Sequence, residues 1–151
     1  MIKVMLADDQ KILSEGIKSV LETCPDIAVC GIAYDGVQAV DMARALRPDV
    51  ILMDVRMPEM NGVAATKRIK ESFPDIKIII LTTFDDSDYI LSGINNGASG
   101  YLLKDIGSAA LIDAIKNAYA ADPILPSTIA RKIAEAALSV SSDQPVKLKS
   151  T

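Results

Sequence analysis

The sequence predicts an α/β fold, a doubly wound sheet of five parallel strands with helices on both faces, and three observations support this class. Short apolar runs alternate with longer segments whose apolar residues have helical spacing. The alternation of strand and helix occurs five times, which favours parallel strands joined by right-handed crossovers. Residues 50–54 include four consecutive apolar residues, as is typical of a strand covered on both faces.

Each predicted strand is followed by a predicted helix, and proline or glycine marks the turns. The strands are expected at residues 3–8, 28–33, 50–54, 77–82 and 100–103. The helices are expected at residues 12–24, 36–46, 61–72, 87–96 and 108–121. The first helix places an apolar stripe on one face, made of Ile12, Leu13, Gly16, Ile17, Val20, Leu21 and Cys24.

Composition limits the classes of protein that fit. The chain has 151 residues, 50% of them hydrophobic and 24% charged, which suits one domain with its own core. It has no apolar stretch of the roughly 20 residues that a membrane span needs and no signal-like leader, so a cytoplasmic location is expected. The net charge of −4 is the wrong sign for a surface that binds DNA through its phosphates.

Acidic residues end two of the apolar runs. Asp8 and Asp9 follow the first predicted strand, and Asp54 ends the third. An isolated carboxylate is costly to remove from water, and the carboxyl ends of parallel strands meet at one edge of the sheet. We therefore expect the three carboxylates to converge around a cation. Oxygen ligands without a nearby histidine or thiolate favour Mg²⁺.

The same edge can accommodate a phosphoryl group. A carboxylate such as Asp54 can act as the nucleophile in phosphoryl transfer and give an acyl phosphate. Lys104 follows the last predicted strand and can supply a second positive charge, and Thr82 can donate a hydrogen bond. A single strand-terminal aspartate is often only a helix cap, but three of them together with Thr82 and Lys104 favour a site.

Two other classes of protein share some of these features. A dinucleotide-binding enzyme uses a similar sheet, but its first strand leads into GxGxxG, whereas here the first strand leads into "ADDQ". A magnesium phosphohydrolase also uses an aspartate nucleophile, but it needs a second acid two residues later, where this chain has Arg56. The dinucleotide-binding class is close to excluded, and the phosphohydrolase remains the weaker alternative.

The motifs "DVRMPEMNG", "LTTFDD" and "GASGYLLKD" resemble the receiver domain of two-component response regulators, and the NarL/FixJ subfamily in particular. The resemblance covers residues 1–121 and implies a flavodoxin-like (βα)5 fold. It also implies a role for each of seven residues: Asp54 as phosphoacceptor; Asp8, Asp9, Asp54 and the Arg56 backbone carbonyl as Mg²⁺ ligands; Thr82 as switch hydroxyl; Lys104 as phosphate-pairing lysine; and Tyr101 as an aromatic that changes rotamer. On this basis the chain is not an enzyme beyond its own phosphorylation and dephosphorylation.

The resemblance further implies partners and an output. A sensor histidine kinase would donate the phosphoryl group, and the segment 85–105 would change conformation and so control a DNA-binding transcription regulator. Residues 122–151 are expected to form a linker helix at 127–138 and a flexible tail, with the subfamily's helix-turn-helix domain absent from this chain. We expect the helix to pack on its own receiver or to pair with a second copy on phosphorylation. A stand-alone receiver that acts through protein contacts is the alternative.

Overall fold

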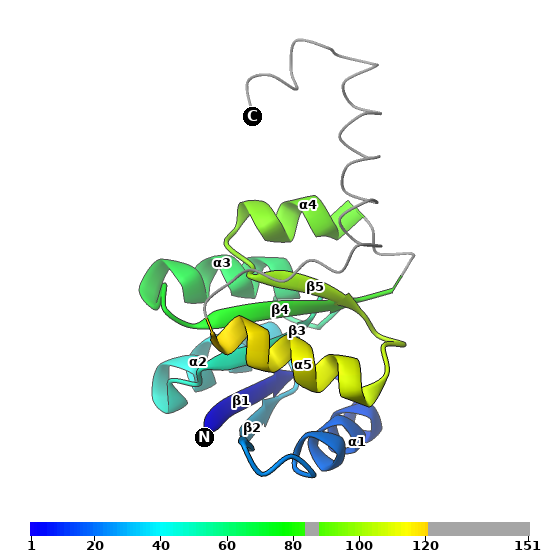
Figure 1. Cartoon of the computed structure of the whole chain (residues 1–151). Coiled ribbons are helices and arrows are strands. Elements are labelled where there is room, and N and C mark those ends of the chain that lie inside the picture. The colour runs from blue at the N-terminus through cyan, green and yellow to red at the C-terminus, as the bar shows by residue number, and fades with distance from the viewer. Residues whose placement is uncertain (84–87, 121–151) are drawn as a thin grey trace.

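A five-stranded parallel sheet forms the centre of the molecule, as the sequence predicted (Figure 1). The computed structural model describes residues 1–83 and 88–120. The strands are β1 (Ile2–Ala7), β2 (Ile27–Ala33), β3 (Val50–Asp54), β4 (Lys77–Thr82) and β5 (Gly100–Leu103). Their order in the sheet is β2-β1-β3-β4-β5, so β1 and β3 are neighbours although β2 lies between them in sequence.

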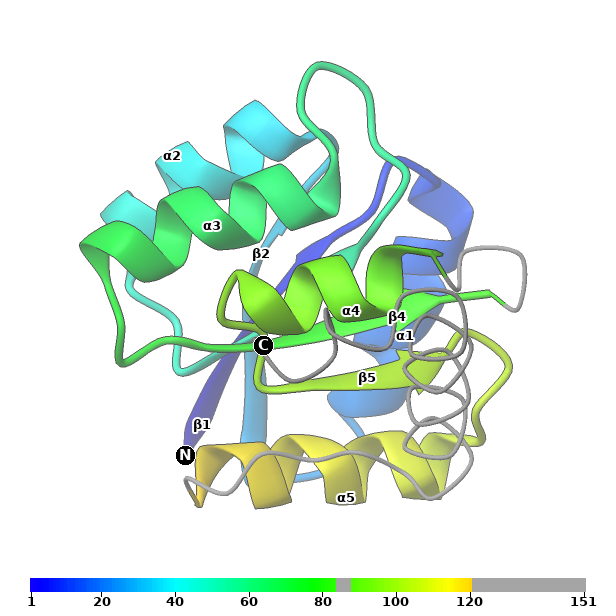
Figure 2. The same cartoon turned by 90° about the horizontal axis from the view of Figure 1, so that it is seen from above.

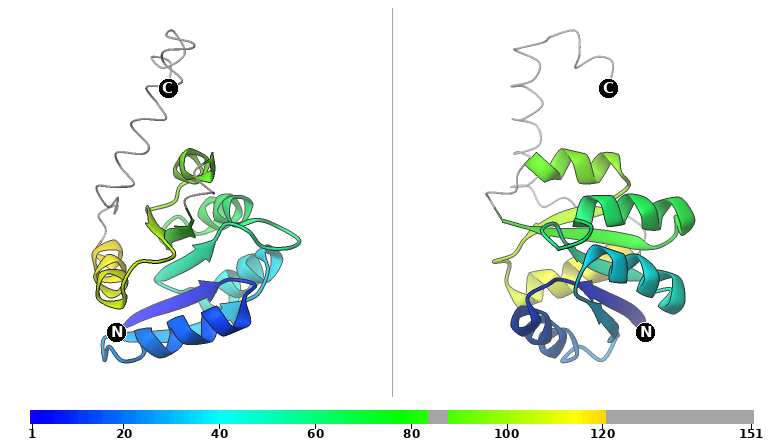
Figure 3. Two further views of the ribbon diagram at one scale, coloured as in Figure 1. Left: turned by 90° about the vertical axis from the view of Figure 1, so that its right-hand side faces the viewer. Right: turned by 180° about the vertical axis from the view of Figure 1, so that it is seen from behind.

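In the described residues, five helices cover the two faces of this sheet. They are α1 (Lys11–Leu21), α2 (Gly36–Leu46), α3 (Gly62–Ser72), α4 (Asp88–Asn95) and α5 (Ser108–Tyr119). Seen from above, α2, α3 and α4 lie on one face, and α1 and α5 lie on the other (Figure 2). The side views show the same three layers (Figure 3). Every helix predicted between residues 12 and 121 is present, with ends that differ by at most a few residues.

Alternation of side chains along the central strands produces two hydrophobic cores. In β3, Ile51 and Met53 pack on the side of α2 and α3, whereas Val50 and Leu52 pack on the side of α1 and α5. All four side chains are at most 1% exposed. Burial of each side chain stabilises the fold by about 1.5–3 kcal/mol. The apolar run that identified β3 in the sequence therefore contributes to the cores on both faces of the sheet.

Side-chain caps account for some of the polar residues at the turns. Asp35 accepts a hydrogen bond from the Gln38 backbone N–H at 2.7 Å and begins α2. Asn61 accepts one from the Ala64 N–H at 2.9 Å and begins α3. Both residues satisfy a donor in the first turn of a helix, which is the ordinary structural role of such side chains.

Some predictions concern residues outside the described part of the chain. The helix expected at 127–138 and the tail after it lie there, as do residues 84–87 of the segment 85–105. The domain boundary at residue 121 stays a prediction. In the two described ranges, no helix is long and apolar enough to cross a membrane.

Candidate functional site

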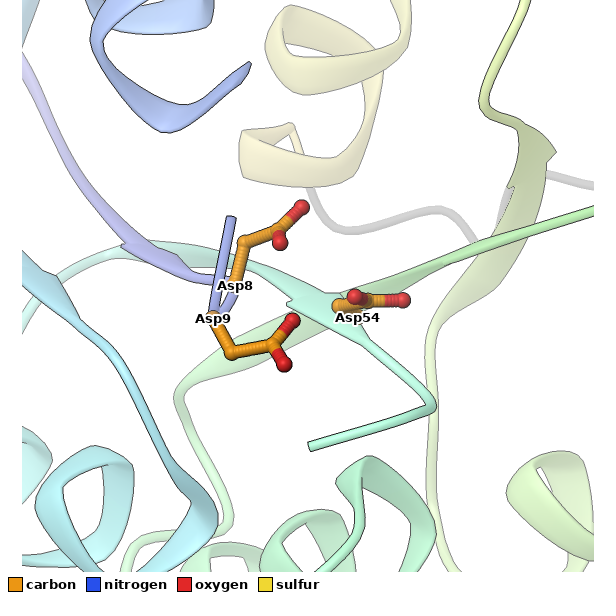
Figure 4. A group of neighbouring side chains, drawn as sticks. All are labelled: Asp8, Asp9 and Asp54. Atoms are coloured by element: carbon orange, nitrogen blue, oxygen red, sulfur yellow. The ribbon is translucent and has the colours of Figure 1, made fainter. Parts of the chain in front are cut away.

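Three carboxylates meet at the carboxyl edge of the sheet (Figure 4). Asp8 and Asp9 follow β1, and Asp54 is the last residue of the neighbouring strand β3. One oxygen from each of the three side chains lies within 4.8 Å of the others. We call Asp8, Asp9 and Asp54 the acidic cluster.

The three acids differ in their exposure to solvent. Asp8 is 3% exposed and Asp54 is 2% exposed, whereas Asp9 is largely open to solvent. Asp8 Oδ1 accepts a hydrogen bond from the Gln10 N–H at 2.8 Å. Its other oxygen, Oδ2, is buried and has no hydrogen-bond partner among the described residues. A buried carboxylate oxygen without a hydrogen bond is costly, so this atom is suited to contact a cation.

Lys104 is the cation that the structure places against the buried acids. Its Nζ lies 2.9 Å from Asp54 Oδ1 and 4.0 Å from Asp8 Oδ2. The Lys104 backbone N–H donates to the Thr82 carbonyl at 2.8 Å, which fixes the start of the loop after β5 against the end of β4. The lysine is therefore held in place through its backbone as well as through its ion pair.

The environment of Asp54 raises its pKa from 3.8 to about 6. Burial is the largest cause, and the negative charge of Asp8 adds to it. Hydrogen bonds from Lys104 and from the Arg56 backbone N–H act in the opposite direction but do not cancel it. One lysine thus only partly neutralises the cluster, and the site favours additional positive charge.

The loop after β3 packs closely on the end of the strand. The Gly62 N–H donates to the Val55 carbonyl at 2.8 Å. A Cβ added at Gly62 would overlap the Asp54 carbonyl group. The glycine of "MPEMNG" therefore permits the loop to turn back directly against the residue that carries the central carboxylate.

Thr82 lies at the end of β4 and is fully buried, whereas Thr83 is exposed. Adjacent strand residues face opposite sides, so only one of these two threonines can face the site, and the resemblance favours Thr82. The Thr82 hydroxyl donates to the Thr83 carbonyl at 3.1 Å. Thr82, Lys104 and Leu103 also line a small cavity of about 160 Å³ beside the acidic cluster. The hydroxyl can therefore turn toward this cavity, and its role in switching stays a prediction.

The remaining two residues singled out from the sequence take different positions. Arg56 is exposed beside the cluster and contributes its backbone N–H to Asp54. Its carbonyl as a metal ligand stays a prediction. Tyr101 is not part of the cluster, because its side chain is buried in the core that contains Ile80 and packs against Gly93 of α4. Burial raises the pKa of the Tyr101 phenol.

A groove between α1 and α5 was not predicted from the sequence. It has a volume of about 440 Å³ and extends to Lys104. Its apolar lining is Ile12, Leu13, Ile17, Val20, Leu81, Ile106 and Leu111. The apolar stripe predicted on α1 contributes Ile12, Leu13, Ile17 and Val20 to this groove, and Ile12 is 91% exposed. The apolar stripe is the signal in the sequence for this surface, but only the structure shows that part of the stripe stays exposed.

Comparison with known proteins identifies the class of protein. The family model of the response regulator receiver domain matches residues 4–116. The chain therefore belongs to the response regulator receiver domain family. Its relatives are transcriptional regulators of the NarL/LuxR type. The resemblance stated from the motifs is confirmed at this level.

Individual relatives support the same assignment. The chain is 46% identical to YxjL of Bacillus subtilis, an uncharacterized transcriptional regulatory protein, over 87% of this chain and 61% of that protein. It is 45% identical to the B. subtilis transcriptional regulatory protein LiaR over 88% of this chain and 63% of LiaR. A LuxR-family response regulator from Aurantimonas superposes with a TM-score of 0.83 at 33% identity, covering 91% of this chain and 99% of that one. The chain spans about three-fifths of the length of these two curated relatives.

We predict that Asp54→Asn stabilises the protein at pH 7.5 in the presence of a chelator, by about 1–3 kcal/mol. Because the pKa of Asp54 is higher in the folded protein than its ordinary value, its contribution to stability is greatest below about pH 4 and is lost as the pH rises through about 6. The gain should therefore be smaller at pH 5 than at pH 7.5. Urea unfolding followed by circular dichroism measures both values.

Asp105→Asn is the matched control, since Asp105 is exposed, adjoins Lys104 and lies outside the acidic cluster. It should leave the free energy of unfolding nearly unchanged. A loss of stability in Asp54→Asn, or a gain of equal size at both pH values, would contradict the electrostatic account.

Proposed function

We propose that this receiver accepts a phosphoryl group on Asp54 from a phosphorylated histidine of a sensor kinase, in a reaction that requires Mg²⁺. The observation that carries the proposal is the ion pair of 2.9 Å between Lys104 Nζ and Asp54 Oδ1, formed beside a buried oxygen of Asp8 that has no hydrogen bond among the described residues. A nucleophilic carboxylate, a fixed cation and further acids at one edge are the groups that phosphoryl transfer to a carboxylate uses.

The chemistry at Asp54 is a transfer between two acceptors. An oxygen of the ionised Asp54 carboxylate forms a bond to phosphorus as the bond from phosphorus to the donor nitrogen breaks, and the imidazole leaves with that electron pair. Lys104 can then donate to an oxygen of the bound phosphoryl group. Thr82 can redirect its hydroxyl from the Thr83 carbonyl to another phosphoryl oxygen. The chain contains no histidine, so the donor must be a partner or a small phosphodonor.

The acidic cluster fits a divalent cation with hard oxygen ligands. The carboxylates of Asp8, Asp9 and Asp54 and the carbonyl of Arg56 would hold Mg²⁺. Asp8 Oδ2 is buried without a hydrogen bond among the described residues, and such an ion would satisfy it. Burial raises the pKa of Asp54, and the nearby charge of Asp8 raises it further, so a bound cation would favour the ionised carboxylate. Bound Mg²⁺ would neutralise charge on the transferring phosphoryl oxygens.

The groove between α1 and α5 supports a helical kinase partner. It is apolar, it is bordered by the exposed Ile12, and it reaches Lys104 at the acidic cluster. An amphipathic helix can place its apolar face in such a groove. A histidine carried on that helix near Lys104 would then lie close to Asp54, which is the geometry that transfer needs.

The output that we propose is control of transcription. The curated relatives are longer than this chain and are named transcriptional regulatory proteins. The net charge of −4 makes this chain a poor ligand for DNA, so DNA binding would depend on a further domain. Phosphorylation adds negative charge at Asp54 and can alter the surface of residues 85–105 that such a domain or a second copy contacts.

We predict that acetyl phosphate with Mg²⁺ adds one phosphoryl group to the protein and that Asp54→Asn removes this labelling. Intact mass spectrometry measures the added mass, and Asp105→Asn should be labelled like the parent. Labelling of Asp54→Asn at the parental rate would contradict the assignment. Rapid turnover of acetyl phosphate without a labelled protein would favour the phosphohydrolase alternative.

We predict that Asp8→Asn and Asp9→Asn each weaken Mg²⁺ binding by more than about tenfold, because each removes an anionic oxygen from a hard-cation site. Isothermal titration calorimetry with MgCl₂ measures the affinity, with Asp105→Asn as the control for loss of one negative charge. Titrations of both variants that superpose on the parent would show that the acidic cluster does not bind the metal.

We predict that Ile12→Glu lowers the rate of transfer from a phosphorylated sensor kinase by at least about tenfold, because a charge in the groove disfavours docking of an apolar helix. Labelling by acetyl phosphate should stay within about twofold, since the site itself is unchanged. Val37→Glu, at an exposed apolar residue of α2, is the control. Equal loss of both reactions would show that Ile12 affects the site or the fold, not docking.

A further inference from the structure

The loop after β3, residues 55–61, carries the backbone carbonyl of Arg56 that is expected to bind Mg²⁺. Two buried side chains anchor the start of this loop, because Val55 is 0% exposed and Met57 is 9% exposed. The next three residues, 58–60, form a bend, and we call them the crest of the loop. Only Met57 separates Arg56 from the crest, so the position of the Arg56 backbone depends on where the crest is held.

The crest rests on Gly36, the buried first residue of α2. The Pro58 carbonyl accepts hydrogen bonds from the Gly36 N–H at 3.5 Å and from the Met60 N–H at 2.7 Å. A Cβ added at Gly36 would overlap the Met60 carbonyl oxygen and would lie 2.6 Å from both the carbonyl carbon and the Cβ of Met60. Because two of these atoms belong to the backbone, a side chain at position 36 requires the crest to move away from α2.

The close approach of the crest accounts for glycine at position 36, whereas the backbone conformation does not. The φ of Gly36 lies outside the left-handed region, and alanine is more favourable than glycine in a helix. Glu59, in contrast, has a φ of 69° in the crest, where glycine would be less strained. The crest thus adopts a bend that its own residues disfavour, which indicates that the contact with α2 helps to hold it.

The beginning of α2 is a firm support for the crest. Asp35 accepts a hydrogen bond from the Gln38 N–H at 2.7 Å, and Gln38 Oε1 accepts one from the Tyr34 N–H at 3.0 Å. Ala39, in the same turn of the helix, is fully buried in the core. A clash at position 36 would therefore displace the crest, which contains the exposed residues 58 and 59, and leave the helix in place.

We propose that Gly36 is a positioning residue that holds the crest against α2 and thereby keeps the Arg56 carbonyl where it can complete the Mg²⁺ site. The part that concerns the metal rests on the proposed function, whereas support of the loop rests on the contact between Gly36 and Met60 alone. A side chain at position 36 leaves the three carboxylates of the acidic cluster in place. It shifts the crest and, through Met57, the backbone of Arg56.

The first test follows the loop by amide hydrogen exchange in the metal-free full chain. Gly36→Ala should accelerate exchange of the Arg56 and Met60 amides at least about tenfold more than exchange of the β3 amides, which report opening of the whole fold. Val37→Ala, at the exposed next residue of α2, should leave the loop at parental rates. Exchange at Arg56 and Met60 that changes no more than exchange in β3 would overturn the proposal.

The second test measures the metal site directly. In calorimetric titration with MgCl₂, Gly36→Ala should weaken binding by about threefold or more, because a displaced carbonyl is lost as a ligand. The Mg²⁺ concentration that gives half-maximal labelling by acetyl phosphate should rise by the same factor, whereas the rate at saturating Mg²⁺ should stay within about twofold. Val37→Ala should match the parent in both measurements.

The outcomes of this test separate the two parts of the proposal. Unchanged Mg²⁺ affinity in Gly36→Ala would overturn the link to the metal, as would a lower saturating rate without a change in affinity. If the parent itself does not bind Mg²⁺, the proposed metal site is refuted, and amide exchange still decides whether Gly36 supports the loop.

The third test asks whether Gly36 acts through the crest. Pro58→Gly makes the crest more flexible, so adding Gly36→Ala in that background should shift the logarithm of the Mg²⁺ affinity by less than half as much as in the parent. Equal shifts in the two backgrounds would overturn the proposal. If Gly36→Ala alone does not fold, as judged by circular dichroism, Pro58→Gly should restore folding, and failure to do so would overturn it as well.

Discussion

The structure depends on the burial of two carboxylates, Asp8 and Asp54, beside a single lysine. Like charges that are removed from water repel one another strongly, and Lys104 contributes one positive charge against two buried negative charges and the exposed Asp9. Burial raises the pKa of Asp54, and the negative charge of Asp8 adds to this effect. The hydrophobic packing of the sheet must therefore stabilise a site that is electrostatically unfavourable without a further cation.

The strand order is what brings these charges together. β1 and β3 are adjacent, so Asp8 and Asp54 lie at neighbouring strand ends even though 45 residues separate them in sequence. Both strands are interior members of the sheet, and their side chains on either face are buried by helices. Lys104 reaches the same point from the edge strand β5, with its backbone bonded to the end of β4. A rigid parallel sheet thus holds four charged groups that flexible loops could not keep in register.

Periodicity and strand-end chemistry in the sequence were sufficient to predict the fold and the convergence of the acids. The apolar run of β3 placed Asp54 at the end of the strand, because the run that is buried on both faces stops at this carboxylate. The sequence could not show that Asp8 is buried while the adjacent Asp9 is exposed, since this depends on the loop that Gln10 closes. The sequence also could not show that Tyr101 packs against Gly93. This contact between a strand side chain and a helix depends on how closely α4 packs on the sheet, which no local pattern encodes.

Lys104 lies where the groove between α1 and α5 meets the small cavity beside Thr82. It lines the groove between α1 and α5 on one side and the small cavity with Thr82 on the other. A new phosphoryl group at Asp54 would draw both Lys104 and Thr82 toward it, and so would change both surfaces at once. The Thr82 side continues along β4 and β5 to Tyr101. On the function that we propose, the groove would bind the donor and the face of the sheet at β5 would respond, and the ion pair of Lys104 with Asp54 would connect them.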